Sequence, residues 1–282
     1  MKVLLTGATG QLGQALRQHC PPGIMLVATS RLGGEGLVPL DLADAGACAA
    51  AVQAHRPDWL LNAGAYTAVD KAESEPELAL AVNAAAPAAM AQALSATGGR
   101  LLQISTDFVF NGQQSSPYQP DQAPSPIGVY GATKAAAEER VLGALPQGRA
   151  RVLRTGWVYG PVGHNFCRTM LRLHRSKAAA GESLQVVAAC WRAIGVGLEP
   201  AAAGALPRIL HWSDAGAASW YDVAVAIGDC AQAAGLLERP APVLPITTAD
   251  YPTPARRPST PCLSAALVAR PSASSRCTGA RP

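Results

Sequence analysis

The chain has 282 residues, of which 49% are hydrophobic and 5% aromatic, and this length allows one large α/β domain or one domain with a smaller lobe. Its net charge of +4 does not indicate nucleic-acid binding, because the five arginines after Ala255 leave residues 1–254 at −1 and no basic stripe is interleaved with aromatics. Seven scattered cysteines predict reduced thiols in a cytoplasmic protein, and the sequence has neither a signal-peptide layout nor the run of about 18 apolar residues that would predict a membrane helix.

Short apolar segments that suit β-strands alternate with longer segments that suit helices. The predicted strands are Val3–Thr6, Ile24–Thr29, Leu37–Leu40, Trp59–Ala63, Leu101–Ser105 and Val152–Leu153. The predicted helices are Gln11–Cys20, Ala45–His55, Glu77–Ala96 and Thr133–Leu145. This alternation predicts an α/β fold with a Rossmann-like doubly wound parallel sheet, in which ligands bind beyond the carboxyl ends of the strands.

The alternation loosens after about Trp157, where Gly and Pro interrupt it. We therefore expect a dinucleotide-binding domain over residues 1–156 and a smaller C-terminal substrate lobe, interleaved with the sheet, over residues 157–257. Residues 258–282 are rich in Pro, Ser, Ala and Arg and have few large apolar side chains, so a disordered tail is expected there.

A glycine-rich turn joins the first predicted strand to the first predicted helix. In this context Gly7 permits a tight turn, Gly10 lets the backbone approach a pyrophosphate, and Gly13 lets the helix pack close to the strand. The phosphates would bind at the positive end of the helix dipole, with Gln11 and Leu12 in its first turn. Glycines also mark ordinary turns, but the strand and helix on either side favour dinucleotide binding.

Arg31 follows the second predicted strand, where an NAD enzyme often carries an acidic residue for the ribose 2′-hydroxyl. A guanidinium with the neighbouring Ser30 hydroxyl suits a 2′-phosphate instead, so NADPH is the expected cofactor. NADH stays possible, because Arg31 could also be a solvated side chain.

Tyr130 and Lys134 are four residues apart, so on a helix they lie on one face. The lysine charge would favour the phenolate and lower the tyrosine pKa, so that the hydroxyl could exchange a proton with a substrate oxygen. Thr106, just after a predicted strand, could hydrogen-bond a substrate carbonyl. By itself each residue has a structural alternative: a half-buried aromatic, a solvated lysine and a turn-stabilising threonine.

Together these residues resemble the extended short-chain dehydrogenase/reductase superfamily, and within it the dTDP-4-dehydrorhamnose reductase family. The resemblance covers residues 1–187 and 210–258. The motifs that carry it are Thr9-Gly10-Gln11-Leu12-Gly13, the run from Ala65 to Glu73 (AYTAVDKAE), the run from Ser105 to Gly112 (STDFVFNG), Tyr130-Gly131-x-x-Lys134, the run from Leu153 to Gly160 (LRTGWVYG), and the run from Tyr251 to Pro258 (YPTPARRP).

The resemblance implies reduction of the C4 ketone of dTDP-4-dehydro-L-rhamnose to dTDP-L-rhamnose, a step in nucleotide-sugar and cell-surface polysaccharide biosynthesis. Thr106, Tyr130 and Lys134 would be catalytic, and Thr106, Asp107 and Trp157 would bind the dTDP-sugar. The implied cofactor residues are Gly7, Gly10, Gln11, Leu12, Gly13, Arg31, Asp41, Leu42, Ala63, Gly64, Ala65, Tyr66, Thr67, Tyr130 and Lys134. Asp41 has a helix-capping alternative, and Asp107 a turn-capping one.

Three departures from the family pattern are visible. The family's Asp-Gln-x-Gly-x-Pro-Thr segment is missing after Val187, where the sequence reads Ala-Ala-Cys-Trp-Arg, and Trp191 in that run is expected to be structural. After Pro258 the family's terminal region is not recognisable; both stretches look like the product of a shifted reading frame. Gln14 and Ala15 stand where some members have acidic residues for a magnesium-linked dimer, so no metal is predicted, while a homodimer stays possible.

Two other functions are open at this point. A non-catalytic NADP-binding regulator would resemble the regulatory subunit of methionine adenosyltransferase, and the atypical second half would suit reduced activity. A nucleotide-sugar epimerase or dehydratase of the same superfamily would keep the cofactor without consuming it.

Overall fold

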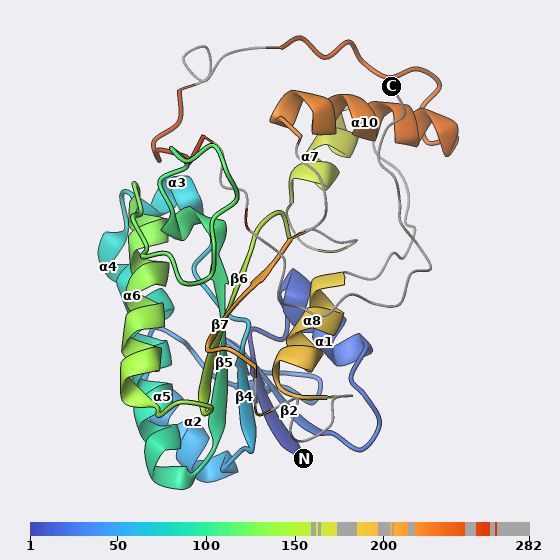
Figure 1. Cartoon of the computed structure of the whole chain (residues 1–282). Helices are drawn as coiled ribbons and strands as arrows, with labels where there is room; N and C mark the ends of the chain where they lie inside the picture. Colours follow the sequence, from blue (N-terminus) through green and yellow to red (C-terminus); the bar gives the residue numbers. More distant parts are fainter. Residues whose placement is uncertain are drawn as a thin grey trace.

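The computed structural model describes residues 1–158, 162, 165–173, 185–196, 204, 206–213, 218–245, 252–259 and 263. At its centre is a seven-stranded parallel sheet in the order β3-β2-β1-β4-β5-β6-β7 (Figure 1). The strands are β1 (Lys2–Thr6), β2 (Met25–Ser30), β3 (Val38–Pro39), β4 (Trp59–Asn62), β5 (Arg100–Thr106), β6 (Ala150–Thr155) and β7 (Ile209–Trp212). The strand order reverses between β1 and β4, so the carboxyl ends of these two strands flank the crevice where such sheets bind ligands.

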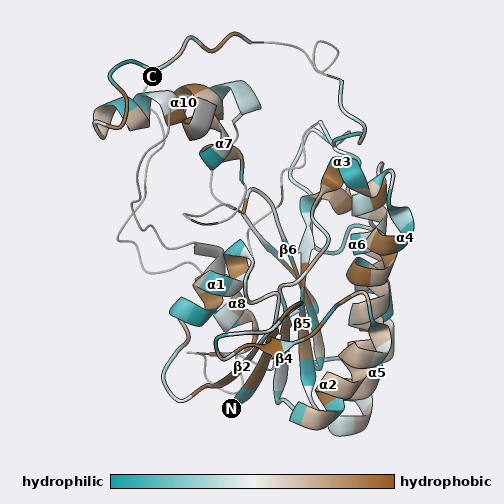
Figure 2. Ribbon diagram, turned by 180° about the vertical axis from the view of Figure 1, so that it is seen from behind, coloured by the Kyte–Doolittle hydropathy of each residue, from teal (hydrophilic) through white to brown (hydrophobic). Residues whose placement is uncertain are grey.

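Helices cover both faces of the sheet (Figure 1). One face carries α1 (Gln11–Gln18) and α8 (Gln185–Ala193), and the other carries α2 (Ala45–His55), α5 (Ala86–Thr97) and α6 (Val129–Ala144). Because both faces are covered, the strands contain apolar runs that are buried on both sides, and Val3, Leu4 and Leu5 have no exposed surface. Figure 2 shows the same arrangement as hydrophobic strands between helices whose outer surfaces are more polar. The predicted doubly wound fold is confirmed.

The remaining helices lie toward the carboxyl ends of the strands (Figure 1). They are α3 (Val69–Ala72), α4 (Pro76–Leu80), a short 3-10 helix η2 (Asp107–Val109), α7 (Phe166–Leu173) and α10 (Trp220–Ala233). A capping box starts α10, since the Ser219 hydroxyl accepts the Asp222 N–H and the Asp222 carboxylate accepts the Ser219 N–H. No strand was predicted at β7 and no helix at α7, α8 or α10.

The predicted helix Glu77–Ala96 is interrupted by a turn of π-helix, Ala81–Ala85, between α4 and α5. Pro87 explains the interruption, because its ring nitrogen cannot donate to the Asn83 carbonyl four residues earlier. The continuous segment Pro76–Thr97 meets the length and hydropathy of a membrane span, but half of its most apolar window is buried. It packs against α2 and α6, as a core helix does.

Three residues of the predicted tail are placed against the body of the protein. Pro258 and Leu263 are buried, Tyr118 and Leu263 form a parallel β-bridge, and the Ser259 hydroxyl donates to the Gly112 carbonyl at 2.7 Å. These contacts involve residues after Pro258, where the tail was expected to begin, and the extent of the tail stays a prediction. Residues 264–282 lie outside the described residues.

Candidate active site

The glycine turn packs directly against the loop that follows β4. Gly7 has a φ of +66°, which favours glycine. A Cβ atom at this position would lie 2.5 Å from the Gly64 Cα, so a side chain would clash with the Gly64 backbone. A Cβ on Gly13 would lie 2.1 Å from the Gly7 carbonyl oxygen, which explains why α1 approaches β1 so closely. No side chain of the described residues caps the N-terminus of α1. This cradle fits the pyrophosphate of a dinucleotide.

A chain of buried hydrogen bonds fixes the ends of the three central strands. The Thr6 hydroxyl donates to the Asn62 side-chain oxygen at 2.5 Å, and the Asn62 amide donates to Gln103 at 2.7 Å. The Thr6 oxygen also accepts the Gly64 N–H at 3.2 Å. The chain thus holds the loop of Ala63, Gly64 and Ala65 beside the glycine turn. Asn62 and Gln103 were not predicted as site residues, although each is a polar residue in an otherwise apolar strand.

The three predicted catalytic residues meet where β5 ends and α6 begins. Thr106 is the buried last residue of β5, and its side chain lies close enough to Tyr130 to affect the pKa of the phenol. Tyr130 lies in the first turn of α6 and Lys134 in the next, where the lysine Nζ donates to the Ile104 carbonyl at 2.5 Å. Because α6 starts at Val129 rather than at Thr133 as predicted, Tyr130 is helical and the spacing of four residues places both side chains on one face.

Burial dominates the electrostatics of these groups. Although part of the Tyr130 side chain is exposed, desolvation and then the Asp107 carboxylate raise its pKa to about 12, while Thr106 acts in the opposite direction. Burial lowers the pKa of Lys134 to about 8, against the influence of Glu138. The expected lowering of the tyrosine pKa by Lys134 is wrong for this structure, because the lysine amine turns toward the β5 backbone.

Asp107 follows Thr106 and lies under the end of β6. Its carboxylate accepts the Thr106 hydroxyl at 2.8 Å, and a Cβ on Gly156 would come within 2.8 Å of its second oxygen. Burial raises the pKa of Asp107 to about 6, while its hydrogen bonds to Thr106 and to the backbone lower it. Gly156 is thus required for the close approach of the β6 backbone to this carboxylate.

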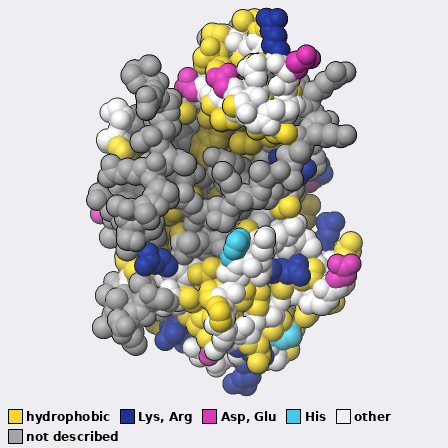
Figure 3. All heavy atoms as spheres, turned by 90° about the vertical axis from the view of Figure 1, so that its right-hand side faces the viewer, with side chains coloured by type: hydrophobic (Ala, Val, Ile, Leu, Met, Phe, Trp, Pro, Cys, Tyr) yellow, Lys and Arg dark blue, Asp and Glu magenta, His cyan; other side chains and the backbone are white. Residues whose placement is uncertain are grey.

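Trp157 belongs to an aromatic cluster with Phe166 and Trp220, contributed by the end of β6, α7 and α10. The ring centroids are 5.9 Å apart for Trp157 and Phe166, 4.5 Å for Trp157 and Trp220, and 4.4 Å for Phe166 and Trp220. Trp157 has a φ of +54° and is 40% exposed. Figure 3 shows hydrophobic side chains along the hollow between the part that carries α10 and the part below it. The cluster places inclined aromatic rings beyond the strand ends.

The predicted residues on the β2 and β3 side are less tightly held. Arg31 is exposed at the end of β2, and the neighbouring Ser30 hydroxyl is used locally, since it accepts the Gly33 N–H at 3.0 Å. Asp41 accepts the Ala43 N–H at 2.9 Å in a turn of its own. Leu42 contacts the glycine region, because its Cδ1 lies 2.5 Å from where a Gly64 Cβ would be.

Asn83, in the π-helical turn, was not predicted and joins the loop after β4 to α6. Its side-chain oxygen accepts the Tyr66 N–H at 2.8 Å, and its amide donates to the Tyr66 carbonyl and to the Thr133 hydroxyl, both at 3.1 Å. The Thr133 hydroxyl donates to the Tyr130 carbonyl at 2.9 Å. The loop with Tyr66 and Thr67 is thereby fixed to the helix that carries Tyr130. The sequence signal that could have identified Asn83 was a polar residue inside an otherwise apolar predicted helix.

Two of the narrow family motifs meet at the start of α6. The Glu73 carboxylate accepts the Val129 N–H at 2.8 Å, immediately before Tyr130. Asp70, one turn earlier on α3, forms an ion pair of 2.7 Å with Arg257 and accepts the Ala255 N–H at 3.1 Å. The described C-terminal segment 252–259 is therefore held against α3. The sequence contained both motifs but could not show that they touch.

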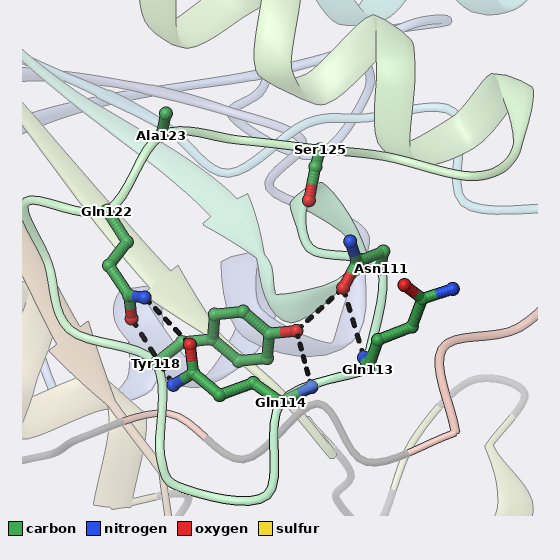
Figure 4. A pocket seen from close by; sticks show the side chains of 7 residues that line it. All are labelled: Asn111, Gln113, Gln114, Tyr118, Gln122, Ala123 and Ser125. Carbon is green, nitrogen blue, oxygen red and sulfur yellow. Dashed lines mark hydrogen bonds between the residues drawn. The ribbon is translucent and has the colours of Figure 1, made fainter.

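A separate hollow of about 420 Å³ lies beside the loop that follows η2 (Figure 4). Its amide side chains bond to one another, with Gln122 donating to Gln114 at 2.8 Å, and the Tyr118 hydroxyl donates to Asn111 at 2.8 Å. These bonds shape the loop, and none of the predicted catalytic residues lines the hollow. In the part of the chain that the structure describes, no group of three His, Cys, Asp or Glu side chains could hold a metal ion.

The parallel sheet, the glycine turn and the Thr-Tyr-Lys constellation together define an extended short-chain dehydrogenase/reductase. The chain belongs to the family described as the RmlD substrate binding domain, whose model matches residues 1–272. It is 38% identical over 269 residues to the dTDP-4-dehydrorhamnose reductase of Salmonella typhimurium, covering 92% of this chain and 87% of that protein.

Solved structures agree with this family. A dTDP-4-dehydrorhamnose reductase from Clostridium acetobutylicum superposes with a TM-score of 0.79 at 29% identity, covering 95% of this chain and 91% of that one. The enzyme of that name from Bacillus anthracis, in complex with NADP, has a TM-score of 0.79 at 28% identity over 93% and 90% of the two chains.

Proposed function

We propose that this chain reduces the C4 ketone of dTDP-4-dehydro-L-rhamnose to dTDP-L-rhamnose with NADPH. The observation that carries the proposal is the meeting of Thr106, Tyr130 and Lys134 at the carboxyl end of β5, two strands from a glycine turn that fits a pyrophosphate. The relative from Salmonella typhimurium carries the name of this activity.

The chain's own residues would bind the ketone and supply the proton, and the nicotinamide cofactor supplies a hydride when bound. The neighbouring Thr106 and Tyr130 hydroxyls would both hydrogen-bond the substrate oxygen. With a pKa raised to about 12, Tyr130 holds its proton at neutral pH and is suited to donate it to the developing alkoxide. Lys134 would orient the nicotinamide ribose. Asp107 and the aromatic cluster would contact the sugar nucleotide.

NADPH is the preferred cofactor in this proposal, and NADH stays possible. The NADP of the Bacillus anthracis structure supports it, as does exposed Arg31 at the end of β2, where a 2′-phosphate would reach it. Gly7, Gly10, Gly13 and the loop after β4 would hold the rest of the dinucleotide. The division of the chain at residue 156, the adenine contact of Asp41 and a homodimer stay predictions.

The proposal is tested by following NADPH absorbance with dTDP-4-dehydro-L-rhamnose and identifying the product sugar. Oxidation of one NADPH per dTDP-L-rhamnose is expected, with none when the sugar nucleotide is omitted. NADPH binding without turnover would favour the non-catalytic regulator. Conversion of the sugar without net NADPH consumption would favour the epimerase or dehydratase.

A further inference from the structure

Glu138 lies one helical turn after Lys134 and is the centre of a buried network. Its carboxylate accepts the Ser105 hydroxyl at 2.5 Å and forms a two-pronged ion pair with Arg154, whose Nη2 is 2.6 Å and whose Nε is 3.0 Å from the carboxylate oxygens. Glu138 is 3% exposed and Arg154 1%. One carboxylate thus connects α6 to β5 next to Thr106 and to β6 two residues before Gly156.

The network continues from Arg154 to β7 and to the loop after η2. Arg154 Nη1 is 3.3 Å from His211 Nε2 and donates to the Pro120 carbonyl at 3.2 Å. Its guanidinium also lies 5.0 Å from the centre of the Phe110 ring. Burial and the Arg154 charge lower the pKa of His211 to about 4, so this histidine is neutral and leaves Glu138 as the counter-charge of Arg154.

Stability alone does not account for such a pair. Removing two charges from water is costly, and replacing a buried ion pair with apolar residues of similar volume is often neutral or stabilising. What distinguishes this pair is its position, because Lys134 is also buried, at 3% exposure, and a buried ammonium needs a nearby anion. Residues four apart on a helix have Cβ atoms about 5–6 Å apart, which brings Glu138 within reach of that charge.

We propose that Glu138, held by Ser105 and Arg154, is a positioning residue that keeps Lys134 protonated and directed for cofactor binding. The inference rests on the proposed function only for the role of Lys134 toward the nicotinamide ribose. Among the described residues, Glu138 is the charged group that raises the pKa of Lys134, and Tyr130 lies one turn earlier on the same face of α6.

The direction of the effect follows from the charges. Burial lowers the pKa of Lys134 to about 8 and the Glu138 carboxylate raises it. Removing the carboxylate therefore lowers the pKa further, and Lys134 loses its proton at a lower pH. An opposite charge at close range shifts a pKa by about 1–3 units, so a midpoint at least about one pH unit lower is expected.

The test measures the Lys134 titration directly by NMR of protein labelled at the lysine side-chain carbons. The chain has only four lysines, at positions 2, 71, 134 and 177, and loss of one signal in Lys134→Arg assigns the resonance. The main variant is Glu138→Gln combined with Arg154→Met, which removes the carboxylate together with its guanidinium partner, so that Arg154 is not left buried without a counter-charge. Ser105→Ala is the matched control, because it removes one hydrogen bond to Glu138 and no charge.

We expect the Lys134 midpoint to fall by about one pH unit in the double variant and to stay in place in Ser105→Ala. NADPH affinity, measured by fluorescence, should fall in the double variant at pH 8 more than at pH 6. Glu138→Asp keeps the charge, so the Lys134 midpoint in this variant should stay closer to that of the unmodified protein. This variant also serves as the test if the double variant does not fold. The proposal would be overturned if the Lys134 titration midpoint were unchanged in a folded double variant. It would also be overturned if the Lys134 midpoint in Glu138→Asp fell as far as complete loss of the carboxylate charge predicts. Neither NMR result depends on which sugar nucleotide is reduced.

Discussion

The segment after Val187 departs from the family pattern, whereas the segments that form α7 and α10 keep it. These two regions differ in how they join the sheet. Residues 189–194 belong to the departing stretch, yet Ala189, Cys190 and Ile194 are buried in the same core cluster as Val3 and Leu16. In contrast, α7 and α10 fall where the resemblance holds, and they pack mainly on each other, through the aromatic cluster. A segment of this chain therefore joins the core because its apolar side chains are buried, and not because its sequence resembles the family.

The two regions also differ in their connections to the cofactor half. β7 extends the sheet beside β6, with Leu210 opposite Leu153, so part of the predicted second lobe is part of the sheet. The start of α7 reaches the glycine turn through a side-chain bond, in which the Asn165 amide donates to the Gln11 side-chain oxygen at 2.8 Å. The region after residue 156 is thus joined to the cofactor half both through the sheet and through this side-chain bond.

The largest expected effect comes from removing the proposed proton donor of the cofactor half, the Tyr130 hydroxyl. Tyr130→Phe keeps the ring that packs against Phe108 at 5.7 Å and deletes only the hydroxyl. Turnover should fall by about 10²–10⁴-fold, the usual contribution of general acid–base catalysis, with NADPH affinity nearly unchanged. The measurements are steady-state NADPH oxidation and fluorescence titration. Tyr118→Phe, outside the site, is the control, and a Tyr130→Phe rate above half that of the unmodified protein would remove Tyr130 from the mechanism.

The close contact of α1 with β1 gives a second large effect. A Cβ at Gly13 would lie 2.1 Å from the Gly7 carbonyl oxygen, so Gly13→Ala should destabilise the fold by about 2 kcal/mol and greatly weaken NADPH binding. Gly143→Ala on α6 is the matched control, since no atom lies within 4 Å of its Cβ position, and helix propensity predicts a gain of about 0.5–1 kcal/mol. Chemical denaturation measures both. Equal free energies of unfolding for Gly13→Ala and Gly143→Ala would show that α1 packs less closely against the glycine turn than the structure indicates.

The local parts of this molecule were predictable from sequence. A run such as Val3–Thr6 is buried on both faces, and Gly7 after it can adopt the positive φ that the turn requires, so the first strand, turn and helix appear where the pattern places them. The spacing of Tyr130 and Lys134 is also local, because four residues on a helix fix the shared face.

The rest depends on partners that are distant in sequence. Helix α6 begins four residues before its predicted start because Glu73, 56 residues before Val129, accepts the first N–H group. A helix start capped in this way has no local capping residue; Gly128 occupies the N-cap position. The buried pair of Glu138 and Arg154 was missed for the same reason, since each reads as a surface charge until β6 and α6 are brought together.

A smaller effect is expected at the edge of the cofactor half. Arg31→Ala should weaken NADPH by about tenfold, equivalent to about 1.4 kcal/mol, and leave NADH nearly unchanged, because the contact is with the 2′-phosphate alone. Arg140→Ala, an exposed arginine on α6, controls for the loss of one positive charge. Dissociation constants for both cofactors decide the outcome. Equal losses for NADPH and NADH would show that Arg31 does not read the 2′-phosphate.

The smallest effect concerns the ion pair that holds the C-terminal segment to α3. Asp70 and Arg257 are 41% and 31% exposed, so solvent screening limits their coupling to about 0.5–1 kcal/mol in a double-mutant cycle of Asp70→Asn and Arg257→Met. The hydrogen bond from Arg257 is the main cause that lowers the pKa of Asp70 below its ordinary value. A carboxylate with a lowered folded-state pKa contributes stability above its unfolded pKa of about 4 and loses it as the pH falls through the folded value. The coupling should therefore be present at pH 7 and decline below about pH 4, as measured by denaturant unfolding of the four proteins. A coupling that is zero at pH 7 would mean that the segment is held by its backbone contacts and by Ser259 alone, and that the two narrow motifs meet without stabilising one another.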